Sequence, residues 1–275
     1  MQPIGYYNGR IEPLDTLMIP ALDRGFYFGD GVYDFVLVVG GKPFALEDHL
    51  DRFERSAAQV KIEMPMDRDE LRATLLDLAD RIDTPDKAIY MQLTRGAAPR
   101  NHPFPRAKAS LFAFVKPCPI KDLYKKVRLI STVDKRFSFC NVKTINLLLN
   151  VLAAEEAEAA GVHETVFVRD GYVTECAHSN IHILKDGALI THPTDEHILP
   201  GIARAHMIAQ AKKLGIPVIE RAFTLDELKD ADEVMISSTS GPIIPACEID
   251  GVAIGGRDDA TLCRLRDAIV AEIYE

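Results

Sequence analysis

Residues 139–153 read FCNVKTINLLLNVLA and place Lys143 immediately before a strongly apolar run. The run predicts a helix over residues 144–160 that ends at Gly161, because glycine is typical of helix C-termini. If the lysine is held near buried surface, burial lowers the pKa of its amine and makes that amine a nucleophile. The alternative is a surface lysine whose methylene stem packs on apolar neighbours.

Strands and helices are mixed along the rest of the chain without regular alternation. Strands are expected where short apolar or β-branched runs end at turns, at residues 32–39, 88–94, 111–115, 127–132 and 233–237. Helices are expected where apolar residues recur every three or four positions or a cap precedes them, at residues 46–62, 67–82, 201–214 and 258–274. Tight turns are expected at Asn8-Gly9, Asp170-Gly171 and Asp186-Gly187. The irregular order favours an α+β fold over a doubly wound parallel sheet.

The segment KPCPIKD, residues 116–122, carries two prolines near the middle of the chain and is the expected linker. We therefore predict an N-terminal small domain over residues 1–117, a linker over 118–122 and a larger C-terminal domain over 123–275. A chain of 275 residues is long enough to give both domains a buried core.

The composition, 47% hydrophobic and 27% charged, is that of a globular protein. The net charge of −9 disfavours nucleic acid as a partner, because an acidic chain repels its phosphates. No apolar run is long enough to span a membrane, and the N-terminus lacks the basic-then-apolar layout of a signal peptide. The five cysteines form no CxxC pair, so we expect reduced thiols, no metal centre and a cytoplasmic location.

Three polar side chains are candidates for binding chemistry. Glu175, in GYVTECAHSN, follows an expected strand, where a half-buried carboxylate could pair with a protonated ring nitrogen. A carboxylate in a solvated turn is the alternative. Arg100 and His102, in PRNHPFP, lie on a proline-stiffened loop and could hold a carboxylate, or the loop could simply be solvated. No second histidine lies there at ligand spacing, which argues against a metal.

Two segments of small residues are candidates for phosphate binding, because helix N-termini and turn amides favour anions. SSTSG, residues 237–241, follows an expected strand, and GIA, residues 201–203, opens an expected helix. Arg52, on the first long helix, would add positive charge. A plain loop is the alternative for SSTSG. The FGDG segment around Gly29 lacks the third glycine of a dinucleotide fingerprint and precedes a strand, which argues against a Rossmann site.

These segments occur together and in a fixed order, and with them the chain resembles the fold-type IV pyridoxal-phosphate enzymes. That family includes D-amino acid transaminases, branched-chain L-amino acid transaminases and aminodeoxychorismate lyases. The resemblance extends from Tyr6 to Ile254. The segments that carry it are DRGFYFGDGVYD from Asp23, HLDRFERSA from His49, TRGAAPRNHPFP from Thr94, VKTINLLLNVLA from Val142, VTECAHSN from Val173, ILPGIAR from Ile198 and SSTSGPIIP from Ser237.

The resemblance implies pyridoxal 5'-phosphate as the cofactor and a barrel-like sheet in the C-terminal, cofactor-binding domain. It implies that Lys143 forms the Schiff base and moves the proton between the substrate α-carbon and the cofactor. It implies that Glu175 keeps the pyridine nitrogen protonated and that Leu199 packs against the ring. The other implied cofactor-binding residues, most of them around the phosphate, are Arg52, Ser179, Gly201, Ile202, Ala203, Ser238 and Thr239.

The PRNHPFP loop is most similar to that of the D-amino acid transaminases. The resemblance implies a homodimer in which Arg100 and His102 reach the other subunit's site and hold the substrate α-carboxylate together with Tyr33. The implied activity is amino transfer between D-amino acids, such as D-alanine and D-glutamate, and 2-oxo acids by a ping-pong mechanism.

Other functions stay open on the sequence. A branched-chain L-amino acid or R-amine transaminase and an aminodeoxychorismate lyase would share the fold. A catalytically silent binding protein would keep the scaffold alone, and the presence of Lys143 and Glu175 argues against it. The sequence departs from the family pattern at His178, where relatives carry small and hydroxyl residues. We expect this histidine to fill space near the cofactor.

Overall fold

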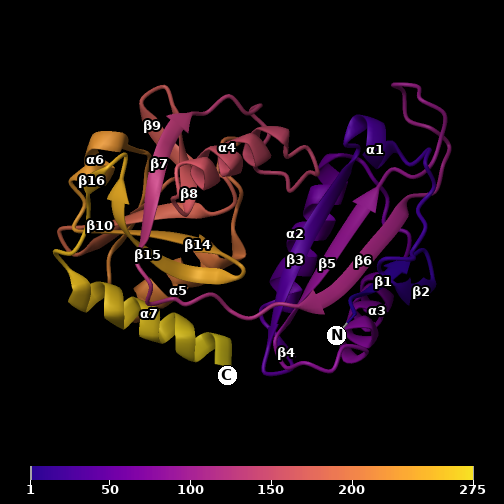
Figure 1. The fold of residues 1–275 in the computed structure, drawn as a ribbon, viewed down its shortest axis with the longest axis horizontal. Coiled ribbons are helices and arrows are strands. Elements are labelled where there is room, and N and C mark those ends of the chain that lie inside the picture. The colour runs from indigo at the N-terminus through magenta and orange to yellow at the C-terminus, as the bar shows by residue number, and fades with distance from the viewer. Residues whose placement is uncertain (1, 275) are drawn as a thin grey trace. The chain divides into compact units, whose positions relative to one another are not determined.

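The computed structural model describes residues 2–274, and its mixture of helices and sheets confirms the α+β class (Figure 1). The chain divides into two compact units. Unit 1 comprises the residues up to Ile120 together with Val142–Asn146, and unit 2 comprises Lys121–Asn141 and the residues from Leu147 onward. The segment around Lys143 therefore belongs with the N-terminal unit, although the predicted boundaries place it in the C-terminal domain.

Unit 1 is built on a six-stranded antiparallel sheet (Figure 1). Its strands, in the spatial order β2-β1-β6-β5-β3-β4, are β1 (Ile4–Tyr7), β2 (Arg10–Pro13), β3 (Gly31–Val39), β4 (Lys42–Pro43), β5 (Lys87–Thr94) and β6 (Ser110–Pro117). Strands β1 and β2 join through the expected turn, where Asn8 has φ 47° and Gly9 φ 91°. Positive φ at both central residues matches the right-handed twist of the strands that follow.

Three helices belong to unit 1: α1 (Arg24–Phe28), α2 (Leu46–Gln59) and α3 (Arg68–Asp80). Helix α3 begins at the expected cap, where the Asp67 side chain accepts a hydrogen bond from the Glu70 amide at 2.9 Å. Helix α2 packs on β3 through the fully buried side chains of Leu50 and Phe53. Each such side chain contributes roughly 1.5–3 kcal/mol when buried, so α2 is firmly fixed to β3.

The other face of this sheet carries a row of half-buried aromatic rings. The Tyr33 ring stacks on the Tyr90 ring with centroids 5.6 Å apart, and Tyr90 stacks on Phe114 at 4.9 Å. Because side chains alternate across a strand, Tyr33 lies on the opposite face from Asp34. Strand β3 therefore presents a phenol on one face of the sheet and a carboxylate on the other.

Unit 2 is built on a ten-stranded mixed sheet that curls, as expected for a barrel-like domain (Figure 1). Its main path follows the order β12-β11-β10-β14-β15-β7-β8-β9-β13, and β16 pairs with β15. The strands are β7 (Val127–Val133), β8 (Glu164–Arg169), β9 (Tyr172–Cys176), β10 (Asn180–Lys185), β11 (Ala188–Thr191), β12 (Val218–Glu220), β13 (Phe223–Thr224), β14 (Glu233–Ser238), β15 (Gly241–Ile249) and β16 (Val252–Ala253).

The helices of unit 2 are α4 (Leu148–Ala159), α5 (Ile202–Lys213), α6 (Leu225–Lys229) and α7 (Asp259–Tyr274). Helix α5 packs against β14, β15 and α7. Helix α6 begins with a capping box, in which the Thr224 hydroxyl accepts from the Glu227 amide and the Glu227 carboxylate accepts from the Thr224 amide. The start of α6 is thus marked in its sequence.

The helix expected from residue 144 begins at Leu148 instead. The residues just before it are extended and pair with β3: Thr144 forms a bridge with Val32, and the Ile145 amide donates to the Gly31 carbonyl at 3.1 Å. Backbone groups that bond to a strand cannot also complete a helical turn. The prediction was therefore wrong by one turn, and the correction places Lys143 on a strand-like segment.

Strand β15 was not expected beyond the SSTSG segment. It contains Pro242 and Pro245, and proline is normally confined to edge strands because it lacks an amide donor. Here β15 lies between β14 and β7, with register shifts on both sides. The irregular pairing accommodates the missing donors.

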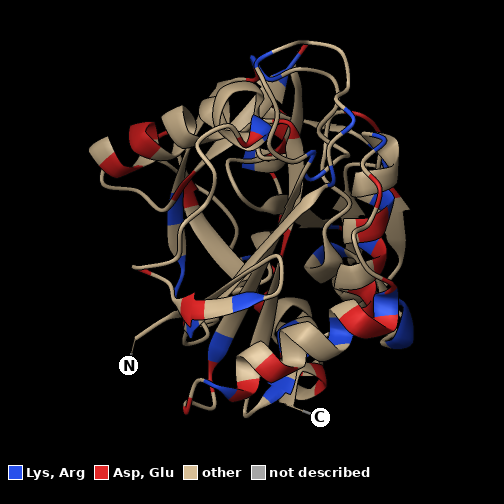
Figure 2. Ribbon diagram, turned by 90° about the vertical axis from the view of Figure 1, so that its right-hand side faces the viewer, with Lys and Arg blue, Asp and Glu red and all other residues tan. Residues whose placement is uncertain are grey.

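Charged residues of both signs are interleaved along the helices of unit 1 (Figure 2). Arg68 of α3 pairs with Glu47 at 3.0 Å and Asp51 at 2.5 Å, both on α2. Exposed pairs of this kind are screened by solvent and contribute little to stability. Among the described residues 2–274, no helix combines the length and the apolar character needed to cross a membrane.

Candidate active site

Lys143 is held against Tyr33 by both its main chain and its side chain. The Tyr33 amide donates to the Lys143 carbonyl at 2.9 Å, and the Lys143 Nζ donates to the Tyr33 hydroxyl at 3.2 Å. The same nitrogen lies 4.3 Å from the centre of the Tyr33 ring. Lys143 is half-buried, and its neighbours Val142 and Thr144 are buried. The geometry gives the amine one fixed position beside a phenol, as a reactive lysine requires.

Helix α2 supports this lysine from the opposite side of β3. The Lys143 amide donates to the Ser56 hydroxyl at 3.3 Å, and Ser56 is buried on α2. One turn earlier on the same helix, Arg52 donates two hydrogen bonds to Asp34 of β3, at 2.8 and 2.7 Å. His49 lies on the same carboxylate, with Nδ1 2.7 Å from Asp34 Oδ1. All four polar side chains of this group are buried.

Electrostatics fix the charges of the Asp34 group. Burial raises the pKa of Asp34, but the Arg52 guanidinium and the His49 hydrogen bond outweigh it and hold the pKa far below its usual range. Burial lowers the pKa of His49, although Asp34 opposes the shift. The group therefore contains one anion, one cation and a neutral imidazole near pH 7. Arg52 is ordered before any ligand arrives.

Glu175 lies on β9 in a second polar group that belongs entirely to unit 2. It is 6% exposed, so it is not the solvated turn carboxylate of the alternative interpretation. Its Oε1 accepts from Arg136 at 2.5 Å, and its Oε2 accepts from the Leu199 amide at 2.9 Å and from Asn180 at 3.1 Å. Both carboxylate oxygens are thus fixed in position.

Arg136 is held in turn by Asp134, which accepts two hydrogen bonds from the guanidinium at 3.0 Å each. The guanidinium also lies over the Phe167 ring, 4.2 Å from its centre. Burial lowers the pKa of Arg136, but Asp134 and Glu175 outweigh it and raise the pKa above its usual value. Glu175 consequently has a permanent cation on one side.

The first turn of α5 lies beside this carboxylate group. Gly201 is the N-cap and makes no side-chain capping bond, so the amides of Ile202 and Ala203 open the helix without a protein cap. A Cβ atom added at Gly201 would collide with the side-chain oxygen of Asn180. Only glycine therefore fits here. The chain passes close to Asn180 at this point, and the Asn180 side-chain amide donates to the Leu199 carbonyl at 2.9 Å.

The SSTSG segment is a strand end and a turn rather than an open loop. Ser238 ends β14, and Thr239 and Ser240 form the connection to β15. The preceding Ser237 points into the sheet, where its hydroxyl lies 2.8 Å from Nε2 of the fully buried His182. Burial lowers the pKa of His182 to about 3, so it is a neutral hydrogen-bonding group. The half-buried Ser238 and Thr239 therefore follow a strand end that the Ser237–His182 hydrogen bond holds in place.

Ser179 and His178 both contact Glu164, a buried carboxylate on β8. The Ser179 hydroxyl donates to Glu164 Oε2 at 2.8 Å, and His178 Nδ1 lies 3.0 Å from Oε1. The His178 side chain is half exposed. These two residues order the turn between β9 and β10. The turn brings the Asn180 side chain within hydrogen-bonding distance of Glu175.

Arg100 and His102 are exposed on the loop between β5 and β6, residues 95–109. Within one chain both rest on the Phe28 ring: the Arg100 guanidinium carbon lies 5.1 Å from its centre, and the His102 ring centre also lies 5.1 Å away. The two candidate carboxylate-binding side chains thus share one aromatic support.

The chain is similar to known proteins over most of its length. A family model described as amino-transferase class IV matches residues 31–249. The chain is a class IV aminotransferase. Proteins named D-alanine aminotransferase are 41% identical in Listeria monocytogenes (98% of this chain, 95% of that protein) and 36% in Bacillus licheniformis (97% of each).

Solved structures of branched-chain aminotransferases also match this aminotransferase. That of Thermoproteus uzoniensis, solved with norvaline, has a TM-score of 0.91 and 25% identity, with coverage of 98% of this chain and 95% of that one. A second branched-chain amino acid aminotransferase with the same TM-score and identity was solved with pyridoxamine 5'-phosphate, and the match covers 100% of this chain and 95% of that one.

Several supporting residues of this aminotransferase were missed by sequence reasoning. Asp34 breaks an otherwise apolar strand at an inward position, which is the signal for a buried carboxylate with a partner. Asp134 and Arg136, two positions apart after β7, carried no such signal, because charged residues that alternate in a short segment after a strand are typical of an exposed loop. In residues 2–274 the structure contains no group of three or more His, Cys, Asp or Glu side chains able to hold a metal ion.

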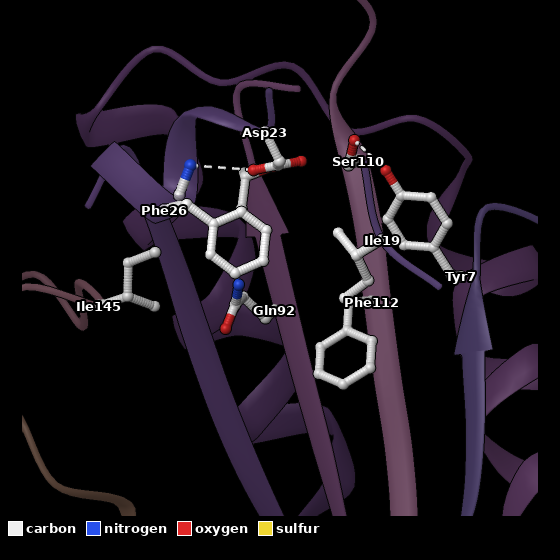
Figure 3. A pocket seen from close by; sticks show the side chains of 10 residues that line it. Tyr7, Ile19, Asp23, Phe26, Gln92, Ser110, Phe112 and Ile145 are labelled. Carbon is white, nitrogen blue, oxygen red and sulfur yellow. Dashed lines mark hydrogen bonds between the residues drawn. The ribbon is translucent and has the colours of Figure 1, made fainter. Parts of the chain in front are cut away.

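Unit 1 of the aminotransferase also has a pocket of about 190 Å³, on the face of its sheet that carries the row of aromatic rings (Figure 3). Asp23, Gln92, Ser110 and Phe112 are among its lining residues, and the ring of Phe26 lies across it in Figure 3. Gln92 is directly opposite Tyr33 in the β3–β5 register. None of the site residues expected from the sequence lines this pocket.

Proposed function

We propose that this protein is a D-amino acid transaminase that moves the amino group between D-amino acids, such as D-alanine and D-glutamate, and 2-oxo acids by a ping-pong cycle. The observation that carries the proposal is the amine of Lys143 fixed beside the Tyr33 hydroxyl at 3.2 Å. The relatives named D-alanine aminotransferase, which match nearly the whole chain, support the choice of substrate.

Class IV aminotransferases depend on pyridoxal 5'-phosphate, and the residues of this chain fit that group. Gly201 leaves room for close approach to α5, and the amides of Ile202 and Ala203 would bind the phosphate together with Thr239, Ser238 and Arg52. Lys143 would bind the cofactor covalently. Glu175, backed by the cation of Arg136, would hold the pyridine nitrogen, and Leu199 would pack on the ring.

Ser179 is the remaining cofactor contact in the proposal. Its hydroxyl donates to Glu164. Besides that cofactor contact it would hold the turn on which Asn180 follows, and His178 on the same turn would share this second task.

When bound, the cofactor supplies an electron sink that weakens the bonds at the substrate α-carbon. The Lys143 Nζ would then take the proton from the α-carbon of the amino donor and pass it to the cofactor. In the second half of the cycle it would deliver a proton to the α-carbon derived from the 2-oxo acid, on the same face, which sets chirality. The Tyr33 hydroxyl accepts a hydrogen bond from that nitrogen and so orients it. Glu175 would stay in place beside the ring nitrogen, because two further donors, Leu199 and Asn180, fix its second oxygen.

We further propose a homodimer, located in the cytoplasm, in which each subunit lends Arg100 and His102 to the site of its partner. With Tyr33 these two side chains would hold the α-carboxylate, the one group that all α-amino acids share. Units 1 and 2 would be the two domains, divided within residues 118–122.

A second candidate function is favoured by the structural relatives, which include branched-chain amino acid aminotransferases. The two functions differ in the enantiomer accepted. Mixing the holoenzyme with matched D- and L-amino acids and with R- and S-phenylethylamine, one at a time, tests both. D-alanine should convert the yellow form of the cofactor to the amine form and release pyruvate. Conversion by L-leucine alone would refute the proposal in favour of the branched-chain function.

Adding aminodeoxychorismate to the same panel separates the remaining alternatives. A lyase would release pyruvate from aminodeoxychorismate without any 2-oxo acid acceptor. A silent binding protein would show no conversion with any of the amines.

A further inference from the structure

Arg24 is a buried arginine that the proposed mechanism does not use. It is 3% exposed and begins helix α1, yet its guanidinium reaches the loop of residues 95–109. One terminal nitrogen donates to the Asn101 carbonyl at 2.5 Å, and the other lies 3.3 Å from the His102 carbonyl, to which it also donates. These carbonyls lie within the short segment that carries both Arg100 and His102. The Arg24 guanidinium thus binds the loop backbone at the positions next to the Arg100 and His102 side chains.

Asp30 fixes Arg24 in this position. It accepts from the Arg24 Nε at 2.7 Å and from Arg95 at 2.9 Å. Burial raises the pKa of Asp30, but the hydrogen bonds from Arg95 and Arg24 outweigh it, so the pKa is lowered. Arg95 in turn donates to the carbonyls of Val60 and Lys61, at 2.8 Å each. The anchor of the loop is therefore continuous with the end of helix α2.

The start of the loop is also tied to the same anchor, and its end lies close to it. The Arg24 amide donates to the Gly96 carbonyl at 3.0 Å. Gly96 has φ +92°, and a Cβ atom there would collide with the Lys108 carbonyl, so only glycine closes the base of the loop. Further along, the Arg95 guanidinium lies 3.6 Å from the centre of the Phe104 ring.

Arg24 also shares an aromatic support with the residues it positions. Its guanidinium carbon lies 4.6 Å from the centre of the Phe28 ring, the ring on which Arg100 and His102 rest. Stacking of this kind restricts a long cationic side chain to few rotamers, which lowers the entropy lost on binding. The two side chains are consequently preorganised before a carboxylate arrives.

We propose that Arg24, held by Asp30, is the positioning residue for carboxylate recognition: it holds the loop of residues 95–109 so that Arg100 and His102 are presented together. This inference rests on the proposed function of those two residues. It assigns Arg24 an effect on the binding of substrates that carry an α-carboxylate, and no part in moving protons. Carboxylate binding persists from substrate to transition state, so its loss raises KM more than it lowers kcat.

The first test measures the loop itself, without catalysis. Amide hydrogen exchange of the substrate-free holoenzyme is followed on peptides covering residues 97–108 in the wild type, Arg24→Lys, Arg24→Ala and Arg68→Ala. Arg68 is the matched control, because it is an ion-paired arginine of the same unit that does not contact the loop. Exchange should accelerate about tenfold or more in Arg24→Ala, less in Arg24→Lys, and not in the control. Wild-type exchange in both Arg24 variants would overturn the inference.

The second test measures recognition. In Arg24→Lys the KM for D-alanine should rise about tenfold while kcat stays within about twofold. If Arg24 variants fail to fold, Phe28→Leu removes the shared ring and should raise the same KM. Faster loop exchange with an unchanged KM would overturn the inference. If Arg100→Ala itself leaves the KM for D-alanine unchanged, the proposed function of Arg100 fails, and with it the recognition role of Arg24; the exchange data would still show the anchored loop.

Discussion

The side-chain nitrogen of Lys143 donates a hydrogen bond to the Tyr33 hydroxyl across 3.2 Å, and the main chains of the same two residues are bonded at 2.9 Å. The side-chain contact therefore does not depend on a flexible stem finding its partner. It is built into the pairing of the segment 142–146 with β3, which also fixes the direction in which the amine points.

Replacing Lys143 should abolish amino transfer. In Lys143→Ala the yellow absorbance of the covalently bound cofactor should be lost, and borohydride should no longer attach the cofactor to the protein. Lys126→Ala, which removes an exposed lysine, is the control and should behave as wild type. The measurement is the absorption spectrum together with the mass of the borohydride-treated chain. Retention of a borohydride-stable adduct in Lys143→Ala would place the reactive amine elsewhere.

Asp34→Asn should weaken cofactor binding, although residue 34 itself would not contact the cofactor. The amide removes the charge that holds Arg52 through two hydrogen bonds, so the arginine is no longer fixed for a phosphate. A charged hydrogen bond contributes about 1.5–3 kcal/mol, which predicts a rise of roughly tenfold to a hundredfold in the Kd of pyridoxal phosphate. Titration of the apoprotein measures it. Asp51→Asn on α2 is the control, and an equal rise there would show that the effect is not specific to the Arg52 group.

Arg136→Met should destabilise the protein, because it leaves Glu175 buried without its cation. Removing one partner of a buried pair costs about 3–5 kcal/mol. Adding Glu175→Gln should restore part of this loss, since Asp134 keeps Arg169 at 3.2 Å. Urea unfolding of the apoprotein, followed by circular dichroism, gives the three values. A double variant no more stable than Arg136→Met would contradict the assigned pairing.

His182 should make the fold sensitive to acid. Burial lowers its pKa to about 3, whereas a histidine in the unfolded chain has a pKa of about 6.5. Between these values the unfolded state binds the extra proton, so stability falls as the pH falls, by about 1.4 kcal/mol per pH unit for this group. His182→Gln keeps hydrogen bonding to Thr191 and Ser237 but should flatten the slope of the unfolding free energy between pH 6 and 4.

The control for this pH dependence is His197→Gln, which changes a partly exposed histidine of the same unit. It should leave the slope of the wild type unchanged. Equal slopes in wild type and His182→Gln would mean that this histidine is not protonated on unfolding.

Much of the fold could be predicted because its signals are local. The Asn8-Gly9 turn and the helix start at Asp67 each depend on a few adjacent residues, and the structure confirms both. The helix start at Leu148 could not be predicted. Residues 144–147 lead directly into the apolar run and suit a helix by themselves, but their backbone bonds to β3, more than a hundred residues away.

The candidate site likewise has residues that the sequence reveals and residues that it does not. Lys143, Arg52 and Glu175 are recognisable in family-like segments of the sequence. Their supports, Asp34 and Arg136, are joined to them only through tertiary contacts, and Arg136 is 39 positions from Glu175. Sequence patterns report spacing along the chain, whereas these hydrogen bonds depend on which strands become neighbours.

The assignment of residues 142–146 to unit 1 constrains how the protein can be dissected. The chain passes between the two units three times, after residues 120, 141 and 146. A fragment cut at the linker would leave the start of β3 without the partner residues Lys143 and Ile145. Neither half can therefore be expressed as a complete module. The N-terminal unit also remains incomplete during synthesis until residue 146 has left the ribosome. The segment that carries the Lys143 amine is therefore the last part of this unit to be made.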